Sequence, residues 1–335
     1  MDQIFHQGHH RPTTQLNKLQ NTGTGTSHSK IILMGEHAVV YDFPAIAMPF
    51  AACQVKVSIQ ASPKETNINC RYFNGPLDQA PQHLDNLVTA TRLTLESFHL
   101  PKQALEITIE SQIPNERGMG SSAAVSVALI RALCDYHQVN ISDYQLRLIT
   151  NEAEVIAHDS TSGIDTLVTS GYQPLIYRKS QQAQAFSIDL DAYLIVADSG
   201  QVGQTKQAVQ HVALLRQQKP EFVDSIMASI GHFVNQAYQA IKDQDILNLG
   251  RLMTYNHYYL NQLGVSNSLL DQIVNAAWLA GALGAKLTGG GMGGCLIALA
   301  EDAIHAQLIA QAMEDAGAKQ TWLLDLSTST GKKEN

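Results

Sequence analysis

The sequence predicts an α+β fold, and three observations support this prediction. The chain has 335 residues, which is enough for two domains or for one large domain. Its apolar patterns place strands and helices in a mixed order, without the regular strand–helix alternation of a doubly wound sheet. A mostly helical stretch over residues 204–280 follows the mixed part, so we expect a domain boundary between 175 and 190.

In the first half, the predicted elements begin near Lys30. The apolar run over 30–40, interrupted by Gly-Glu-His, predicts two short strands joined by a turn. Residues 53–62 alternate as a half-buried strand does, and Pro and Gly in 62–82 predict a loop or hairpin. The spacing then predicts a helix, a strand, a glycine loop leading into an apolar helix, and a second helix, at 83–98, 104–114, 115–133 and 142–157.

In the second half, two strands are expected around a polar stretch at 178–187. Four helical patterns follow within 204–280, and then a strand, a glycine loop and a strand over 285–300. A last helix at 302–316 precedes the apolar segment TWLLDLS.

Composition narrows the function classes. The hydrophobic content is 44%, so a sizeable core can form, and the formal net charge is −8. This charge argues against a nucleic-acid protein with a broad basic face. A negatively charged ligand can still bind through local backbone dipoles and a few cations.

The sequence favours a cytoplasmic protein. Its four cysteines are scattered without a C-x-x-C pair and are expected to be reduced. No segment reaches the roughly 18 uninterrupted apolar residues that span a bilayer. Residues 1–27 contain no hydrophobic signal core, and we expect a poorly ordered leader there.

The stretch NERGMGSSAAVSVALIRAL, residues 115–133, places glycines and serines directly before an apolar helix. Gly118 and Gly120 allow the backbone to bend so that successive amides converge, and a helix start attracts anions. The stretch therefore fits a phosphate-binding loop, although a serine-capped buried helix explains it equally well. A second loop, GGGMGG at 289–294, satisfies G-x-G-x-x-G, but it opens a strand rather than a helix, so a dinucleotide site is not predicted.

Two further stretches carry candidate chemistry. Glu154 offers a hard oxygen ligand suited to Mg²⁺, and Asp165 follows a Ser-Gly turn where it can face a substrate hydroxyl. A surface side chain and a helix cap are the plainer interpretations of these two acids. Lys30 lies at the edge of an apolar strand, and Glu36 and His37 lie in an apolar context, where buried charges need partners. A polar substrate would supply them.

Together, these stretches resemble the motifs of the GHMP kinase superfamily, in the same order and over some nine-tenths of the chain. KIILMGEHAVVYDFPAIA is similar to the first motif of the mevalonate kinase branch, and ERGMGSSAAVSVALIRAL resembles the ATP loop. EVIAHDSTSGIDTLVTSG resembles the segment that carries the catalytic aspartate, and KLTGGGMGGCLIAL resembles the C-terminal glycine loop.

The resemblance implies a role for individual residues. Asp165 matches the catalytic aspartate and Lys30 the lysine beside the reacting hydroxyl, while Ser122 and Glu154 match the Mg²⁺ ligands. The expected phosphate-binding loop comprises Glu116, Arg117, Gly118, Met119, Gly120, Ser121 and Ser122. The residues expected near the acceptor substrate are Glu36, His37, Thr205 and Gly290.

The resemblance also implies the fold and the activity. It implies an N-terminal ribosomal-protein-S5-like domain and a C-terminal ferredoxin-like domain with the site between them, which we place at 28–185 and 186–328. The implied reaction is phosphorylation of the primary hydroxyl of mevalonate by ATP with Mg²⁺, at an early step toward isoprenoids. The expected protein is a homodimer, with no nucleic-acid or membrane partner.

Some features depart from the family pattern. SHSK replaces the usual Ala-Pro-Gly-Lys, STSG replaces Asn-Pro-Ser-Gly, and ERGMG replaces a more glycine-rich sequence. Another small acceptor, with phosphomevalonate or a sugar first, is the alternative within the kinases. A lyase relative, diphosphomevalonate decarboxylase, and a catalytically silent metabolite sensor on the same fold are the alternatives outside them. A sensor needs neither a Mg²⁺ ligand nor a base, which favours an enzyme.

Overall fold

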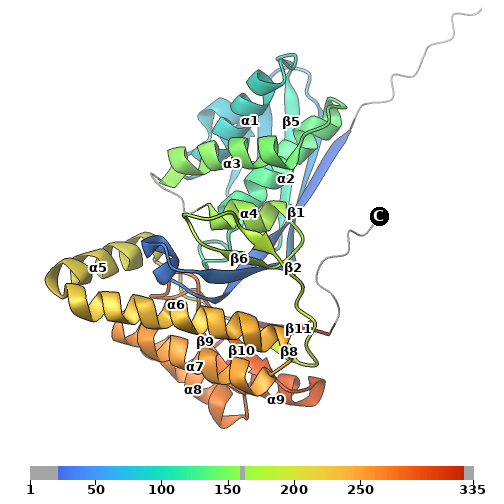
Figure 1. The fold of residues 1–335 in the computed structure, drawn as a ribbon. Helices are drawn as coiled ribbons and strands as arrows, with labels where there is room; N and C mark the ends of the chain where they lie inside the picture. The colour runs from blue at the N-terminus through green and yellow to red at the C-terminus, as the bar shows by residue number, and fades with distance from the viewer. Residues whose placement is uncertain (1–21, 159–162, 328–335) are drawn as a thin grey trace, which may run out of the picture.

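The structure is a computed structural model that describes residues 22–158 and 163–327 (Figure 1). In this part of the chain, strands and helices build two sheets, with α1 to α4 beside the first sheet and α5 to α9 around the second (Figure 1). Within the described residues, no helix is both long and apolar enough to cross a bilayer.

The first sheet contains β1 to β7 in the order β4-β3-β5-β2-β6-β7, with β1 also paired to β2. Its pairs are antiparallel except β3–β5. The strands are β1 (Gly23–Met34), β2 (Ala45–Ala61), β3 (Asn67–Cys70), β4 (Phe73–Pro76), β5 (Leu105–Ser111), β6 (Leu175–Tyr177) and β7 (Gln184–Ala185). The helices beside it are α1 (Asp85–Ser97), α2 (Ser121–Tyr136), α3 (Asp143–His158) and α4 (Ile164–Ser170).

The second sheet has the order β11-β8-β10-β9 and is antiparallel throughout. This order, with helices between β8 and β9 and between β10 and β11, is that of a ferredoxin-like unit. Its strands are β8 (Tyr193–Asp198), β9 (Gly284–Thr288), β10 (Cys295–Ala300) and β11 (Gln320–Asp325). The helices are α5 (Thr205–Gln218), α6 (Pro220–Lys242), α7 (Ile246–Gln262), α8 (Ser268–Leu279) and α9 (Ala303–Asp315).

Successive side chains of a strand point to opposite sides of its sheet, and both sides of the second sheet are covered. Ile195 and Ala197 of β8 pack in a cluster with α5, α6, α8 and α9. Leu194 and Val196 belong instead to the core that also contains the first sheet. Across this shared core, the rings of Phe50 in β2 and Trp322 in β11 meet edge to face, 6.1 Å apart.

The N-terminal boundary differs from the prediction. β1 begins at Gly23 and pairs with the far end of β2, so the predicted leader is wrong for residues 23–27; residues 1–21 lie outside the described part. Gly23 and Gly25 of this segment have no room for a side chain, because a Cβ on either would collide with the backbone of α2. Close approach of a helix, invisible in a strand pattern, requires them to be small.

The second of the two short strands predicted within 30–40 is also wrong, because the structure has no strand there. That stretch forms a 3-10 turn, η1 (Ala38–Tyr41), flanked by His37 and Asp42 at φ 59° and 65°. Two left-handed residues reverse the chain within a few positions, which leaves no length for a strand. The remaining predicted elements correspond to strands and helices of the structure. β7 ends at Ala185 and β8 begins at Tyr193; the division of the chain at residue 186 stays our proposal.

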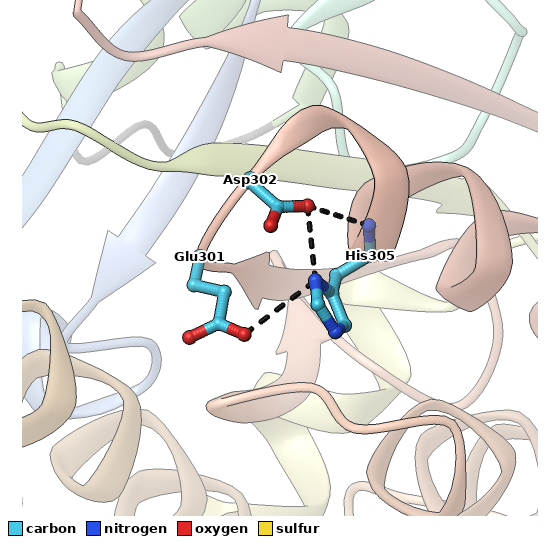
Figure 2. Close-up of side chains that lie close together, drawn as sticks. All are labelled: Glu301, Asp302 and His305. Carbon is cyan, nitrogen blue, oxygen red and sulfur yellow. Dashed lines mark hydrogen bonds and ion pairs between the residues drawn. The ribbon is translucent and has the colours of Figure 1, made fainter.

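Glu301, Asp302 and His305 form a surface cluster at the start of α9 (Figure 2). Asp302 is the N-cap of this helix. Its Oδ1 accepts a hydrogen bond from the backbone N–H of His305 at 2.8 Å and a second from Nδ1 of the His305 ring at 2.9 Å. The hydrogen bond to Asp302 raises the pKa of His305. Helix capping therefore accounts for the closeness of Asp302 and His305, and Glu301 lies 3.5 Å from the same His305 nitrogen.

Candidate active site

The predicted phosphate loop connects β5 to α2, and three of its residues have a left-handed backbone. Glu116, Gly118 and Gly120 have φ values of 54°, 73° and 70°, and Gly120 is the N-cap of α2. A Cβ on Gly120 would also lie 2.9 Å from Cγ of Lys30. Glycine is therefore required here for both conformation and space, and the N-terminus of α2 opens beside Lys30.

The two glycine loops of the sequence pack directly on each other. A Cβ on Gly289, in the β9–β10 loop, would lie 3.0 Å from the carbonyl oxygen of Gly118. The Thr288 hydroxyl, just before that loop, accepts from the N–H of Ile32 at 3.0 Å and donates to its carbonyl at 2.9 Å. These two hydrogen bonds join the second sheet to β1. The β9–β10 loop therefore packs against the phosphate loop.

Lys30 and Asp165, the two predicted catalytic residues, form an ion pair. Lys30 Nζ lies 3.1 Å from Asp165 Oδ1, and the side chains are 4% and 38% exposed. The Lys30 backbone N–H donates to the carbonyl of Met119 at 2.9 Å, which attaches the lysine to the phosphate loop. Asp165 lies in the first turn of α4, after Gly163 at φ 75°. The pair therefore lies beside the start of α2 with its carboxylate accessible.

Ser122 and Glu154, the two predicted Mg²⁺ ligands, also come together. The Ser122 hydroxyl donates to Glu154 Oε1 at 2.7 Å, and Asn86 Nδ2 donates to the Ser122 oxygen at 3.0 Å. Burial raises the pKa of Glu154 to about 7, and repulsion from Asp165 adds to the shift, while the hydrogen bonds from Ser122, Ser126 and Asn86 oppose it. A buried carboxylate in this state is well placed to gain from a cation.

His37, Thr205 and Gly290 meet at the β9–β10 loop. His37 Nε2 lies 2.8 Å from the carbonyl oxygen of Gly290. Burial lowers the pKa of His37 to about 4, although the Gly290 hydrogen bond opposes the shift, so the neutral ring donates its Nε2–H. A Cβ on Gly290 would lie 2.6 Å from Oγ1 of Thr205, the first residue of α5. Three of the four predicted acceptor-side residues are thus neighbours.

Glu36, the fourth, was predicted to gain its partner from the substrate, and this is wrong. Its side chain is fully buried and forms an ion pair with Lys286 of β9, while Asn256 Nδ2 donates to its Oε2 at 3.5 Å. Burial raises the pKa of Glu36 and lowers that of Lys286, and each charge opposes the shift of the other. The protein itself supplies the partner, so Glu36 holds the turn before His37 in place.

Arg117 was predicted to bind phosphate, and its guanidinium points elsewhere. Its Nε donates to Asp198 Oδ1 at 2.8 Å, and its two terminal nitrogens donate to the carbonyls of Asn115 and Gly200 at 3.1 and 3.0 Å. All three nitrogens are engaged within the protein, which leaves phosphate binding to the backbone of the loop. The predicted roles of Glu116, Met119 and Ser121 stay predictions.

Sequence reasoning missed Asn86, Lys286 and Asp198. Asn86 lies in the first turn of an ordinary amphipathic helix, and no local pattern marks it. Lys286 did carry a signal, because a lysine between apolar residues in a buried strand needs a partner as much as Glu36 does. Asp198 ends β8, where acids are common, and only the fold brings it to Arg117.

Known proteins are similar in sequence to this chain over both of its sheets. Residues 86–173 match the GHMP kinases N-terminal domain, and residues 237–319 match the GHMP kinases C-terminal domain. The mevalonate kinase of Pyrococcus abyssi is 33% identical over 296 residues, which cover 81% of this chain and 87% of the relative. The chain belongs to the GHMP kinase family. It is a kinase by this relationship, and the predicted family is confirmed.

Further relatives of this GHMP kinase agree. The mevalonate kinase of Thermococcus sibiricus is 34% identical over 301 residues, covering 82% of this chain and 88% of the relative. The crystal structure of L. major mevalonate kinase in complex with R-mevalonate has a TM-score of 0.78 and 27% identity, covering 92% of this chain and 98% of that one. The predicted two-domain α+β GHMP kinase fold is therefore confirmed.

Proposed function

We propose that this GHMP kinase transfers the γ-phosphoryl group of ATP to the primary hydroxyl of mevalonate, giving 5-phosphomevalonate and ADP. The relatives named above are mevalonate kinases, and a structural neighbour was solved with R-mevalonate. The Lys30–Asp165 pair beside the start of α2 carries the proposal, because it places a proton acceptor next to a phosphate-binding loop.

The chain's own groups account for each part of the reaction. Backbone amides of residues 118–122 and the N-terminus of α2 hold the β- and γ-phosphates. Asp165 accepts the hydroxyl proton as the oxygen forms its bond to the γ-phosphorus, and the bond from that phosphorus to the β-phosphate oxygen breaks. Lys30 stabilises the hydroxyl oxygen as it becomes negative and keeps Asp165 oriented.

The residues present also fit Mg²⁺. The Ser122 hydroxyl and the Glu154 carboxylate are hard oxygen donors from two neighbouring helices, already 2.7 Å apart. The raised pKa of Glu154 shows a carboxylate whose charge is poorly compensated in its surroundings. We propose that these two residues hold the ion that accompanies ATP. When bound, it would neutralise charge on the phosphates.

On the acceptor side, we propose that mevalonate binds against His37, Thr205 and Gly290. The three are neighbours, and the His37 ring is neutral and hydrogen-bonded to Gly290.

We also propose a cytoplasmic location. All four cysteines are free thiols, which suits the reducing cytoplasm. The homodimer and the place of the enzyme in the route to isoprenoids stay predictions.

A coupled ADP-release assay tests the proposal. Mevalonate, phosphomevalonate, galactose and homoserine are each tested separately with MgATP. We expect ADP release with mevalonate and with none of the other three. Release with phosphomevalonate alone would overturn the substrate assignment, and ATP binding without release for any acceptor would favour a sensor. Chelation of divalent ions with EDTA is expected to abolish the release, and Ser122→Ala and Glu154→Gln are expected to raise the Mg²⁺ concentration needed.

A further inference from the structure

Arg117 lies in the phosphate loop but is joined to the acceptor side of the site. Its Nε–Asp198 Oδ1 distance is 2.8 Å, and the two side chains are only 14% and 11% exposed. Its other nitrogens donate to the carbonyls of Asn115 and Gly200. A charge-assisted hydrogen bond this sheltered from water is stronger and more directional than a surface pair.

Asp198 is the residue at which β8 ends and a connecting segment, 198–205, begins. Its Oδ1 also accepts from the N–H of Gly200 at 2.8 Å, so the carboxylate shapes the first turn of this segment. The segment ends at Thr205, which starts α5 and contacts Gly290. Asp198 therefore sets the origin of the segment that delivers Thr205 to the proposed acceptor site.

The phosphate loop and this segment also meet through their backbones. The N–H of Gly203 donates to the carbonyl of Glu116 at 2.6 Å. A Cβ on Gly203 would lie 3.2 Å from the same carbonyl oxygen, so the contact leaves little room for a side chain there. The Arg117 side chain adds two links to this backbone contact, one to the Asp198 carboxylate and one to the Gly200 carbonyl.

We infer that Arg117 and Asp198 are positioning residues that couple the ATP loop to the acceptor segment. Their side chains bind each other and backbone groups of the two segments, and so hold the loop and the Thr205 segment at a fixed distance from each other. This inference rests on the proposed function and deepens it.

Kinetics of Arg117→Ala, Asp198→Ala and the double variant test the inference. Each single variant is expected to raise the KM for ATP and the KM for mevalonate together, by about three- to tenfold, because both sites share the contact. The double variant is expected to be no worse than the poorer single variant. Arg117→Lys is expected to restore part of the loss, since an ammonium can still reach the carboxylate.

The matched control is Arg216→Ala, which breaks an exposed Arg–Asp pair with Nε 2.5 Å from Asp224 Oδ1. It is expected to leave both KM values unchanged. A rise in the KM for ATP alone in Arg117→Ala, with Asp198→Ala normal, would overturn the inference and make Arg117 a phosphate ligand. A lowered Tm with unchanged KM values would overturn it in favour of a purely structural pair.

A second measurement separates this inference from the proposed function. ATP affinity, measured by calorimetry without acceptor, is expected to fall in both single variants by the same factor. If the wild type binds ATP but does not phosphorylate mevalonate, the proposed function fails while these affinities still decide the inference. Should an alanine variant fail to fold, Asp198→Asn and Arg117→Lys replace it, because they keep the hydrogen-bonded shape.

Discussion

Lys30 Nζ lies 3.1 Å from Asp165 Oδ1, which joins strand β1 to the first turn of α4 across the mouth of the phosphate loop. The cation is buried and the carboxylate is accessible, so one member of the pair is fixed and the other is available to a substrate. This relationship makes the roles of the two residues separable by experiment.

Asp165→Ala is expected to lower kcat by about 10² to 10⁴-fold, the usual contribution of a positioned proton acceptor. ATP affinity is expected to change little, because the phosphate loop and the start of α2 do not depend on this side chain. Steady-state kinetics and calorimetry with ATP check the two expectations. Asp143→Ala, which removes an exposed acid of α3, is the control and should keep full activity. Near-normal turnover in Asp165→Ala would place the base elsewhere.

Gly290→Ala is expected to weaken mevalonate binding much more than ATP binding. The new Cβ would lie 2.6 Å from Thr205 Oγ1 and 2.7 Å from its Cα, so the start of α5 must move. The KM values for the two substrates measure the effect. Gly75→Ala is the matched control, since its Cβ meets only the tip of the Phe73 ring, 3.1 Å away, in the β3–β4 hairpin. Equal losses for both substrates would show that Gly290 does not belong to the acceptor side.

Lys286→Met is expected to destabilise the protein by about 3–5 kcal/mol, because it leaves the buried carboxylate of Glu36 without its partner. The free energy of unfolding in urea measures this. The double variant Glu36→Gln with Lys286→Met is expected to recover a large part of the loss, because no buried charge remains. If the double variant is less stable than the single one, charge compensation is not the purpose of this pair.

His37 predicts a pH dependence of stability. Its pKa of about 4 in the folded protein lies below the ordinary 6.5, so the unfolded chain binds more protons between these values. Its contribution is therefore complete above pH 6.5 and is lost as pH falls toward 4, by about 3 kcal/mol.

Urea unfolding of the wild type and of His37→Asn between pH 7 and pH 4 checks this expectation. The wild type should lose about 3 kcal/mol more over this range than the variant, because asparagine does not titrate. His257, whose pKa burial also lowers to about 4, is present in both proteins and affects them equally. Parallel curves for the two proteins would contradict the assignment of the shift to His37.

Much of the fold could be predicted from the sequence because its local patterns are strong. The apolar faces of α5 to α8 and the alternation in the second half of β2 each reflect one buried side. The predictions failed where a small residue served a distant contact, as Gly23 and Gly25 do against α2, or where left-handed residues turned the chain, as at His37.

For the site, the sequence by itself determined which groups are present: a glycine-bent loop before a helix, a lysine on a strand, and acids at 154 and 165. Those features are local, because they follow from backbone freedom and from residue type. Only the tertiary structure decided which groups meet: Glu36 with Lys286, Arg117 with Asp198, and Ser122 with Glu154. Packing determines which residues far apart in the chain come into contact. A buried charge is stable only when the fold places a partner within reach of it.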